Sequence, residues 1–196
     1  MNTVPMPGTC PAPARFAALL AAVIAVQITV LHAMGQPPIC ACGVIRLWQG
    51  DVLGPENSQQ LTDWYTPSHI IHGLLFSLGL KALFPRLSLL KTFAIALCLE
   101  VSWELAENSP PVIERYRQQA LAQGYSGDSI LNSVSDVLAC TLGFFTARVL
   151  PRKLTLALIV AAELFTGFMI RDNLALNIIQ LIHPVPAISD WQARGR

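Results

Sequence analysis

Two histidines beside an apolar run are the first residues whose type and spacing could do chemistry. They are His69 and His72, in the segment DWYTPSHIIHGLLF that covers residues 63–76. A spacing of three residues places both side chains on one face of a helix. Near neutral pH an imidazole can act as a general base or bind a metal ion. Because burial of an unpaired polar group is costly, we expect these histidines to face other polar side chains.

Carboxylates recur at helical spacing in two later segments. The two sets are Glu100, Glu104 and Glu107, and Asp128, Asn132 and Asp136. Residues at i, i+4 and i+7 or i+8 share one helical face. Glu100 lies eight residues before Asn108, and Asp136 lies eight residues after Asp128, so each is about 12 Å inside its segment. An ionised acid at such a depth in a membrane costs roughly 2.5–3.5 kcal/mol or more. We therefore expect these acids to face a polar pocket that they share with the histidines.

Such a pocket could perform acid–base chemistry or hold a divalent metal ion as a cofactor. The candidate catalytic residues are His69, His72, Glu104, Asp128 and Asp136. In an enzyme of this kind the substrate would be a lipid or an envelope precursor at the outer leaflet. The alternative is a small transporter or a membrane assembly factor, in which the polar stripe is an ion path or a helix-packing network. The sequence contains no H-E-x-x-H, G-x-S-x-G or P-loop motif that would decide for an enzyme.

A structural role competes with the chemical one for most of these candidates. The histidines could cap a helix or bind lipid headgroups, and Glu104 could hydrate a helix end. Asp128 suits the N-cap position before the segment SILNS. Glu100 and Asp136 are harder to explain in this way because of their depth.

Two features outside this pattern have several interpretations. Glu163 lies near the middle of an apolar segment, where it either pairs with a polar group or stays neutral by taking up a proton. Cys40 and Cys42 belong to the sequence CAC, which we expect on the oxidising side of the membrane. They could close a small ring, bind a metal ion or pair with other chains.

Five apolar segments must position these groups. The chain has 196 residues, of which 53% are hydrophobic and 13% charged, whereas a soluble domain carries about 25% charged residues. The expected spans cover residues 16–34, 69–84, 89–106, 129–150 and 153–170. This pattern predicts an all-α, polytopic helical membrane bundle of about five spans. Thr66 is the expected N-cap of the second span, with Pro67 in its first turn.

Two further segments are predicted between and after the spans. Residues 109–125 are expected to form an amphipathic helix at the outer face. Residues 174–182 either prolong the fifth span or lie at the membrane interface. Residues 1–14, rich in proline and small residues, are expected to be a disordered head, and residues 15–196 form one transmembrane domain.

The distribution of basic residues predicts the orientation. Loops 85–88 and 150–153 and their flanks are basic, whereas residues 35–66 and 107–128 are richer in acids. Cytoplasmic loops carry an excess of Lys and Arg, so we expect the amino terminus inside and residues 35–66 outside, in a multi-pass protein of the cell inner membrane. The expected partner is the lipid bilayer. A net charge of +1 without a basic run argues against a nucleic-acid partner.

Several strings in the sequence are similar to those of a known family. They are GQPPICACG, ENSQQLTDWYTPSHIIHG, ERYR, GDSILNSVSD and MIRDNLALNIIQLIHP. Together they resemble an uncharacterised family of multi-pass bacterial inner-membrane proteins of unknown function, of the kind labelled UPF or DUF. The resemblance covers residues 35–192. It implies an inner-membrane location in a Gram-negative cell and implies no activity.

Overall fold

The computed structural model describes residues 12–194, and within this range every regular element is an α-helix. The helices are α1 (Ala12–Ala33), α2 (Thr66–Leu83), α3 (Leu89–Glu107), α4 (Pro110–Arg117), α5 (Ile130–Val149), α6 (Arg152–Ile170), α7 (Leu174–Ile182) and α8 (Pro186–Ala193). The prediction of an all-α fold is confirmed. Residues 1–11 of the expected disordered head lie outside the described residues, and α1 begins at Ala12.

Helices α2 and α5 approach each other most closely. A Cβ atom built on Gly73 of α2 would lie 1.9 Å from the Cys140 carbonyl oxygen of α5. One built on Gly143 of α5 would lie 2.1 Å from the Ile70 carbonyl oxygen of α2. Glycines therefore bring the two backbones into direct contact, as small residues do between helices in membranes.

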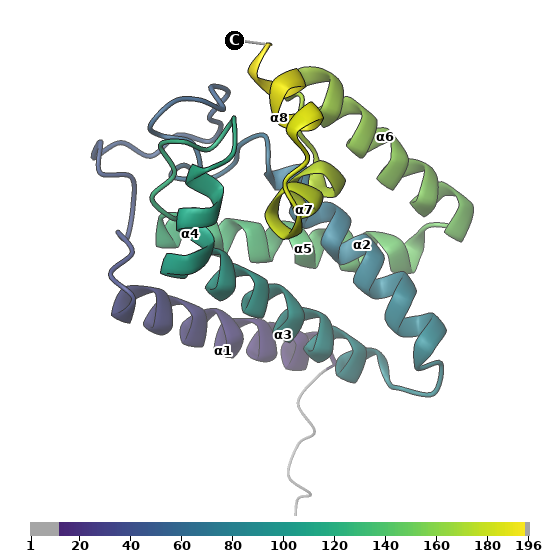
Figure 1. Cartoon of the computed structure of the whole chain (residues 1–196). Coiled ribbons are helices and arrows are strands. Elements are labelled where there is room, and N and C mark those ends of the chain that lie inside the picture. The colour runs from purple at the N-terminus through teal and green to yellow at the C-terminus, as the bar shows by residue number, and fades with distance from the viewer. Residues whose placement is uncertain (1–11, 195–196) are drawn as a thin grey trace, which may run out of the picture.

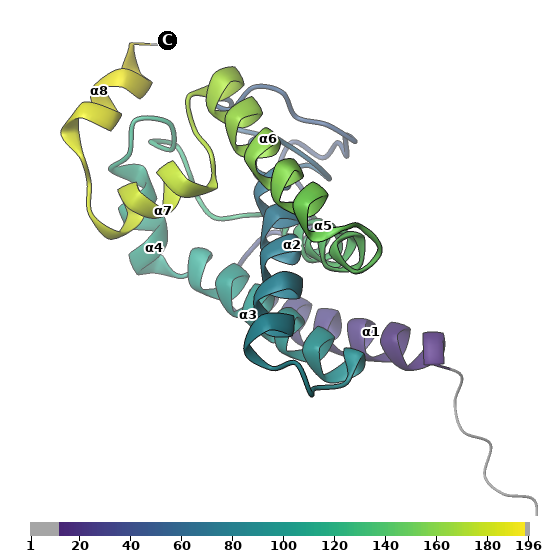
Figure 2. The same ribbon diagram turned by 90° about the vertical axis from the view of Figure 1, so that its right-hand side faces the viewer.

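Helices α1, α3 and α6 pack around this pair (Figure 1). Helix α1 lies beside α3 in both ribbon views (Figures 1 and 2), with Phe16 against Phe93 at a ring-centroid distance of 5.6 Å. Phe93 of α3 and Phe144 of α5 are fully buried in the core that α1, α3 and α5 share. Helix α7 lies beside α4, where the Tyr116 hydroxyl donates to Asn177 Oδ1 at 3.1 Å.

Three of the described helices are long and apolar enough to cross a membrane, namely α1 over Pro13–Ala33, α5 and α6. Only 11% of the apolar stretch of α6 is buried within the molecule, which is suited to contact with lipid. These helices indicate a membrane protein. The expected number of five spans is not confirmed, because α2 and α3 carry the histidines and glutamates in addition to Lys81 and Lys91.

Two predicted helix starts are displaced by one residue. Helix α2 begins at Thr66 itself, and Tyr65 is its N-cap. The Thr66 hydroxyl accepts a hydrogen bond from the backbone N–H of Asp63 at 3.0 Å and so holds the preceding turn. At α5 the N-cap is Ser129, which accepts from the backbone N–H of Asn132 at 3.1 Å. The interpretation of Asp128 as this cap was therefore wrong.

The amphipathic helix expected over residues 109–125 is much shorter. Helix α4 ends at Arg117, and the chain turns back toward the helix after it. The Arg117 Nε donates to the Tyr125 carbonyl oxygen at 2.7 Å, and the Tyr125 ring packs edge-on against Tyr116. These contacts stabilise a compact turn in place of further helix.

Residues 174–182 form a separate helix, so they do not prolong the fifth span. Helix α6 ends at Ile170, and its C-cap Arg171 has a left-handed conformation with φ 57°. The Glu163 carboxylate accepts from the backbone N–H groups of Leu174 and Ala175 at 3.1 and 3.0 Å. A carboxylate is stabilised at the positive end of a helix, so Glu163 finds its partner in the first turn of α7.

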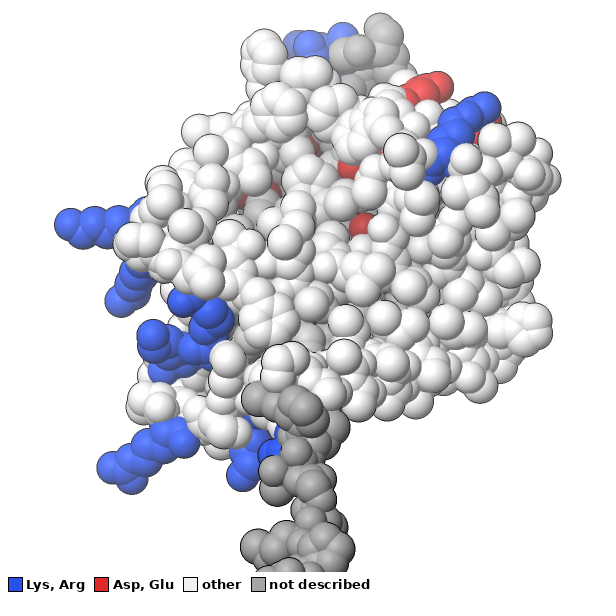
Figure 3. All heavy atoms as spheres, turned by 180° about the vertical axis from the view of Figure 1, so that it is seen from behind, with Lys and Arg blue, Asp and Glu red and all other residues white. Residues whose placement is uncertain are grey.

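Exposed basic side chains gather at one end of the bundle. This basic end comprises the start of α1, the α2–α3 turn and the start of α6, with Arg15, Lys81, Arg86, Lys91, Arg152 and Lys153. Figure 3 shows most Lys and Arg side chains of the visible face along one edge, with the few visible acids elsewhere.

Candidate functional site

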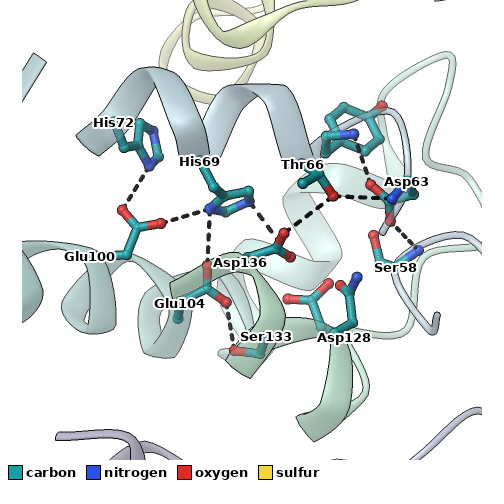
Figure 4. A network of polar contacts seen from close by, with 12 residues as sticks. Ser58, Asp63, Thr66, His69, His72, Glu100, Glu104, Asp128, Ser133 and Asp136 are labelled. Atoms are coloured by element: carbon teal, nitrogen blue, oxygen red, sulfur yellow. Dashed lines mark hydrogen bonds and ion pairs between the residues drawn. The ribbon is translucent and has the colours of Figure 1, made fainter. Parts of the chain in front are cut away.

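His69 lies among three carboxylates from two other helices (Figure 4). Its Nδ1 is 2.7 Å from Glu100 Oε1 and 3.2 Å from Glu104 Oε1, and its Nε2 is 3.8 Å from Asp136 Oδ2. The Nδ1 of His72 is 2.9 Å from the other oxygen of Glu100. We call these five residues the His69 cluster. Each is at most 7% exposed, and the predicted approach of a histidine to a carboxylate is present.

Three helices position the cluster through local periodicity and one close contact. The two histidines are one turn apart on α2, and Glu100 and Glu104 are one turn apart on α3. Asp136 lies two turns before Gly143 on α5. The glycine contact between α2 and α5 therefore sets how near Asp136 comes to His69.

The cluster has more acids than bases. If all three carboxylates were ionised, the cluster would carry a charge of −3 with neutral imidazoles and of −1 with both histidines protonated. Uncompensated charge is expensive to bury. The cluster is therefore suited to take up further protons or a cation.

One carboxylate oxygen of the cluster has no hydrogen-bond donor. Glu104 Oε2 accepts from the Ser133 hydroxyl at 2.5 Å, but Glu104 Oε1 makes no hydrogen bond to any described residue. His69 Nδ1 is near this oxygen, yet it carries at most one proton, and Glu100 Oε1 is the closer acceptor. The free oxygen is the position where a proton or a metal ion would be most stabilising.

The donor atoms fit a divalent metal ion. Two groups of three residues each offer atoms that lie within 4.8 Å of one another: His69, His72 and Glu100, and His69, Glu104 and Asp136. Imidazole nitrogen and carboxylate oxygen are ligands of Zn²⁺ and Mn²⁺ in proteins. The second group contains the free oxygen of Glu104 and is the better candidate.

Asp128 belongs to a neighbouring network. Its carboxylate accepts from the Asn108 amide at 2.6 Å and from the Tyr125 hydroxyl at 2.9 Å. Burial raises the pKa of Asp128 to about 6, and these two hydrogen bonds oppose the rise. The pKa places its titration close to neutral pH, as suits a proton donor or acceptor.

A small cavity of about 40 Å³ connects Asp128 with the cluster. Asp128, His69 and Asp136 all line it, together with Asp63 and Tyr65. This volume is enough for one or a few water molecules. The cavity could carry a proton between Asp128 and the cluster through water.

The sequence interpretation missed several polar partners of the site. The Thr66 hydroxyl is 3.5 Å from Asp136 Oδ1, and Ser133 binds Glu104. Asp63 accepts from the backbone N–H groups of Ser58 and Tyr65. Ser133 lies one turn before Asp136, so helical spacing could have identified it. Nothing in the sequence indicated the role of Asp63, which a turn brings to the cavity.

Cys40 and Cys42 lie outside the cluster and are joined by a disulfide. Of the three interpretations of the CAC sequence, the structure contains the small ring. The residues of the cluster lie on α2, α3 and α5, whereas the two cysteines lie in the loop between α1 and α2. Because their sulfur atoms are bonded to each other, these cysteines supply no ligand to the cluster.

The chain is similar to proteins that have no assigned activity. A family model described as "Protein of unknown function (DUF2585)" matches residues 31–194. The chain is 51% identical over 175 residues to a UPF0314 protein of Sphingopyxis alaskensis, covering 89% of this chain and 93% of that protein. It is 48% identical over 160 residues to a UPF0314 protein of Paracoccus denitrificans, covering 82% and 83%. No solved structure matches the chain.

Proposed function

The chain belongs to the DUF2585 family of unknown function, and we propose that it is a multi-pass inner-membrane enzyme with a divalent metal ion in the His69 cluster. The reaction is a hydrolysis of a lipid or an envelope precursor at the outer leaflet. The observation that carries this proposal is the free oxygen of Glu104, buried beside His69 in a group of three carboxylates and two imidazoles.

The roles of the residues follow from their contacts. His69, Glu104 and Asp136 would hold the ion, which would supply Lewis-acid activation of a water molecule. Ser133 orients Glu104 through its hydrogen bond, and Glu100 orients His69 and His72. Asp128 exchanges protons with the cavity, since burial brings its pKa to about 6.

Access of a substrate requires a movement of α7. Leu174 and Asn177 of α7 line a second small cavity, of about 20 Å³, beside His69 and His72. Neither cavity has room for a lipid headgroup, so α7 acts as a cover that opens for the substrate.

The test of this proposal is metal analysis of the protein purified in detergent. We expect about one equivalent of Zn²⁺ or Mn²⁺ per chain, and a loss of most of it in Glu104→Gln, which removes the charge and keeps the shape. Glu114→Gln is the matched control, because that side chain is 65% exposed on α4. The proposal would be refuted if wild-type protein purified without chelators contained no metal and bound neither Zn²⁺ nor Mn²⁺ when these ions were added.

A small transporter of metal cations is the second candidate. It is favoured by the small volume around the cluster, which suits an ion better than an organic substrate. Proteoliposomes that contain a metal-sensitive dye distinguish the two functions. Metal influx that Glu104→Gln abolishes identifies a transporter, whereas a bound ion without flux favours the enzyme.

The proposed orientation is an amino terminus in the cytoplasm, with the basic end inside. We expect an impermeant maleimide to label Val44→Cys in intact spheroplasts and to label Pro85→Cys only after permeabilisation. Val44 is 49% exposed in the loop between α1 and α2, and Pro85 is exposed in the α2–α3 turn. The parent protein, with all five native cysteines replaced by serine, is the control. If intact spheroplasts were labelled at Pro85→Cys and not at Val44→Cys, the proposed orientation would be wrong.

A further inference from the structure

A larger cavity lies toward the basic end, and its lining on α2 begins one turn after His72, at Leu75. Its volume is about 470 Å³, and residues of α2, α5 and α6 line it. Its basic residues are Lys81 in the last turn of α2, Arg148 in the last turn of α5 and Arg152 at the start of α6. No Asp or Glu is among the described residues of its lining. Three cations around one cavity without an acid attract an anion.

Arg148 is held in the wall of the cavity by contacts with α3 and α5. Its Nη2 donates to the Thr92 hydroxyl at 3.0 Å, and its guanidinium lies over the Phe144 ring. Its Nε is buried and has no hydrogen-bond acceptor in the described part of the chain. Arg148 therefore contributes positive charge to the lining of the cavity, and a phosphate oxygen is a strong acceptor for a guanidinium group.

The rest of the lining is apolar. Leu75 and Leu78 of α2 and Leu156 of α6 form much of the wall. Helices α5 and α6 are both apolar enough to span a membrane, so a cavity between their adjoining ends meets the headgroup region of one leaflet. An anionic head beside leucines matches a phospholipid better than a free phosphate ion.

We propose that this cavity binds one anionic phospholipid. Its phosphate lies among Lys81, Arg148 and Arg152, and an acyl chain follows the leucines of α2 and α6. This site is independent of the chemistry proposed for the His69 cluster.

Native mass spectrometry of the full-length protein in detergent tests the proposal, with phosphatidylglycerol and phosphatidylcholine as probes. We expect one tightly retained phosphatidylglycerol and much weaker binding of phosphatidylcholine. The double variant K81Q/R152Q should weaken phosphatidylglycerol binding by roughly fivefold for each charge removed. Both side chains are exposed, so we expect this variant to fold.

The matched control is R86Q/K91Q. It removes two exposed charges from the same end of the molecule, but neither residue lines the cavity. The control should bind phosphatidylglycerol as the wild type does, and millimolar inorganic phosphate should not displace the lipid. Equal weakening in both double variants would reduce the effect to general surface charge and overturn the proposal. Equal binding of phosphatidylcholine, or displacement by phosphate, would also overturn it.

Discussion

Replacing His69 with glutamine should abolish metal binding to the His69 cluster and any activity that depends on it. Glutamine has a similar reach, but its amide cannot replace an imidazole that lies near Glu100, Glu104 and Asp136 together. The variant would leave three buried acids with only His72 as a base. Breaking a buried charge pair costs about 3–5 kcal/mol, so we also expect a clear loss of thermal stability. Metal analysis and thermal unfolding of the detergent-purified protein measure both effects.

His183→Gln is the control for this variant, because His183 is an exposed residue just after α7. It should bind metal and unfold as the wild type does. If His69→Gln cannot be purified, Asp136→Asn serves in its place, since it removes one proposed ligand and keeps its shape. A full equivalent of metal in either cluster variant would show that the ion binds elsewhere.

Replacing Gly73 with alanine should have the largest effect on the fold. The added methyl group would lie 1.9 Å from the Cys140 carbonyl oxygen and 2.5 Å from the Phe144 nitrogen, both backbone atoms of α5. Backbone cannot move aside as a side chain can, so α2 and α5 must separate. Overpacking of this kind costs about 1–3 kcal/mol or more. Because His72 precedes Gly73 directly, the separation should also draw the histidines away from Asp136 and weaken metal binding.

Gly79→Ala provides a control in the same helix. No atom lies within 4 Å of a Cβ built on Gly79, and alanine favours a helix by about 1 kcal/mol over glycine. We therefore expect Gly79→Ala to unfold at the wild-type temperature or above it. Equal unfolding temperatures for the two variants would contradict the role of the α2–α5 contact.

The helices and their polar faces could be predicted from the sequence because both depend on nearby residues. Apolar segments of span length indicate helices, and the period of 3.6 residues places His69 with His72 and Glu100 with Glu104 on shared faces. The relative positions along α2, α3 and α5 were also sufficient to predict that a histidine and a carboxylate meet.

Helix ends were less predictable, since they depend on partners that are distant in the sequence. Arg171 ends α6 in a left-handed conformation, and the Glu163 carboxylate then holds the start of α7. Asp128 was a plausible cap, but Ser129 takes that position while Asn108 and Tyr125 engage the aspartate. No local pattern distinguishes these outcomes.

The sequence by itself determined an apolar, all-helical chain with histidines and acids on polar helix faces. Only the tertiary structure decided that both histidines share Glu100, that Glu104 keeps a free oxygen, and that Asp128 joins a separate network. The physical reason is that the faces follow from helical geometry within one segment. The pairings follow from how close the helices come and how they are rotated, and the contacts at Gly73 and Gly143 set these between α2 and α5.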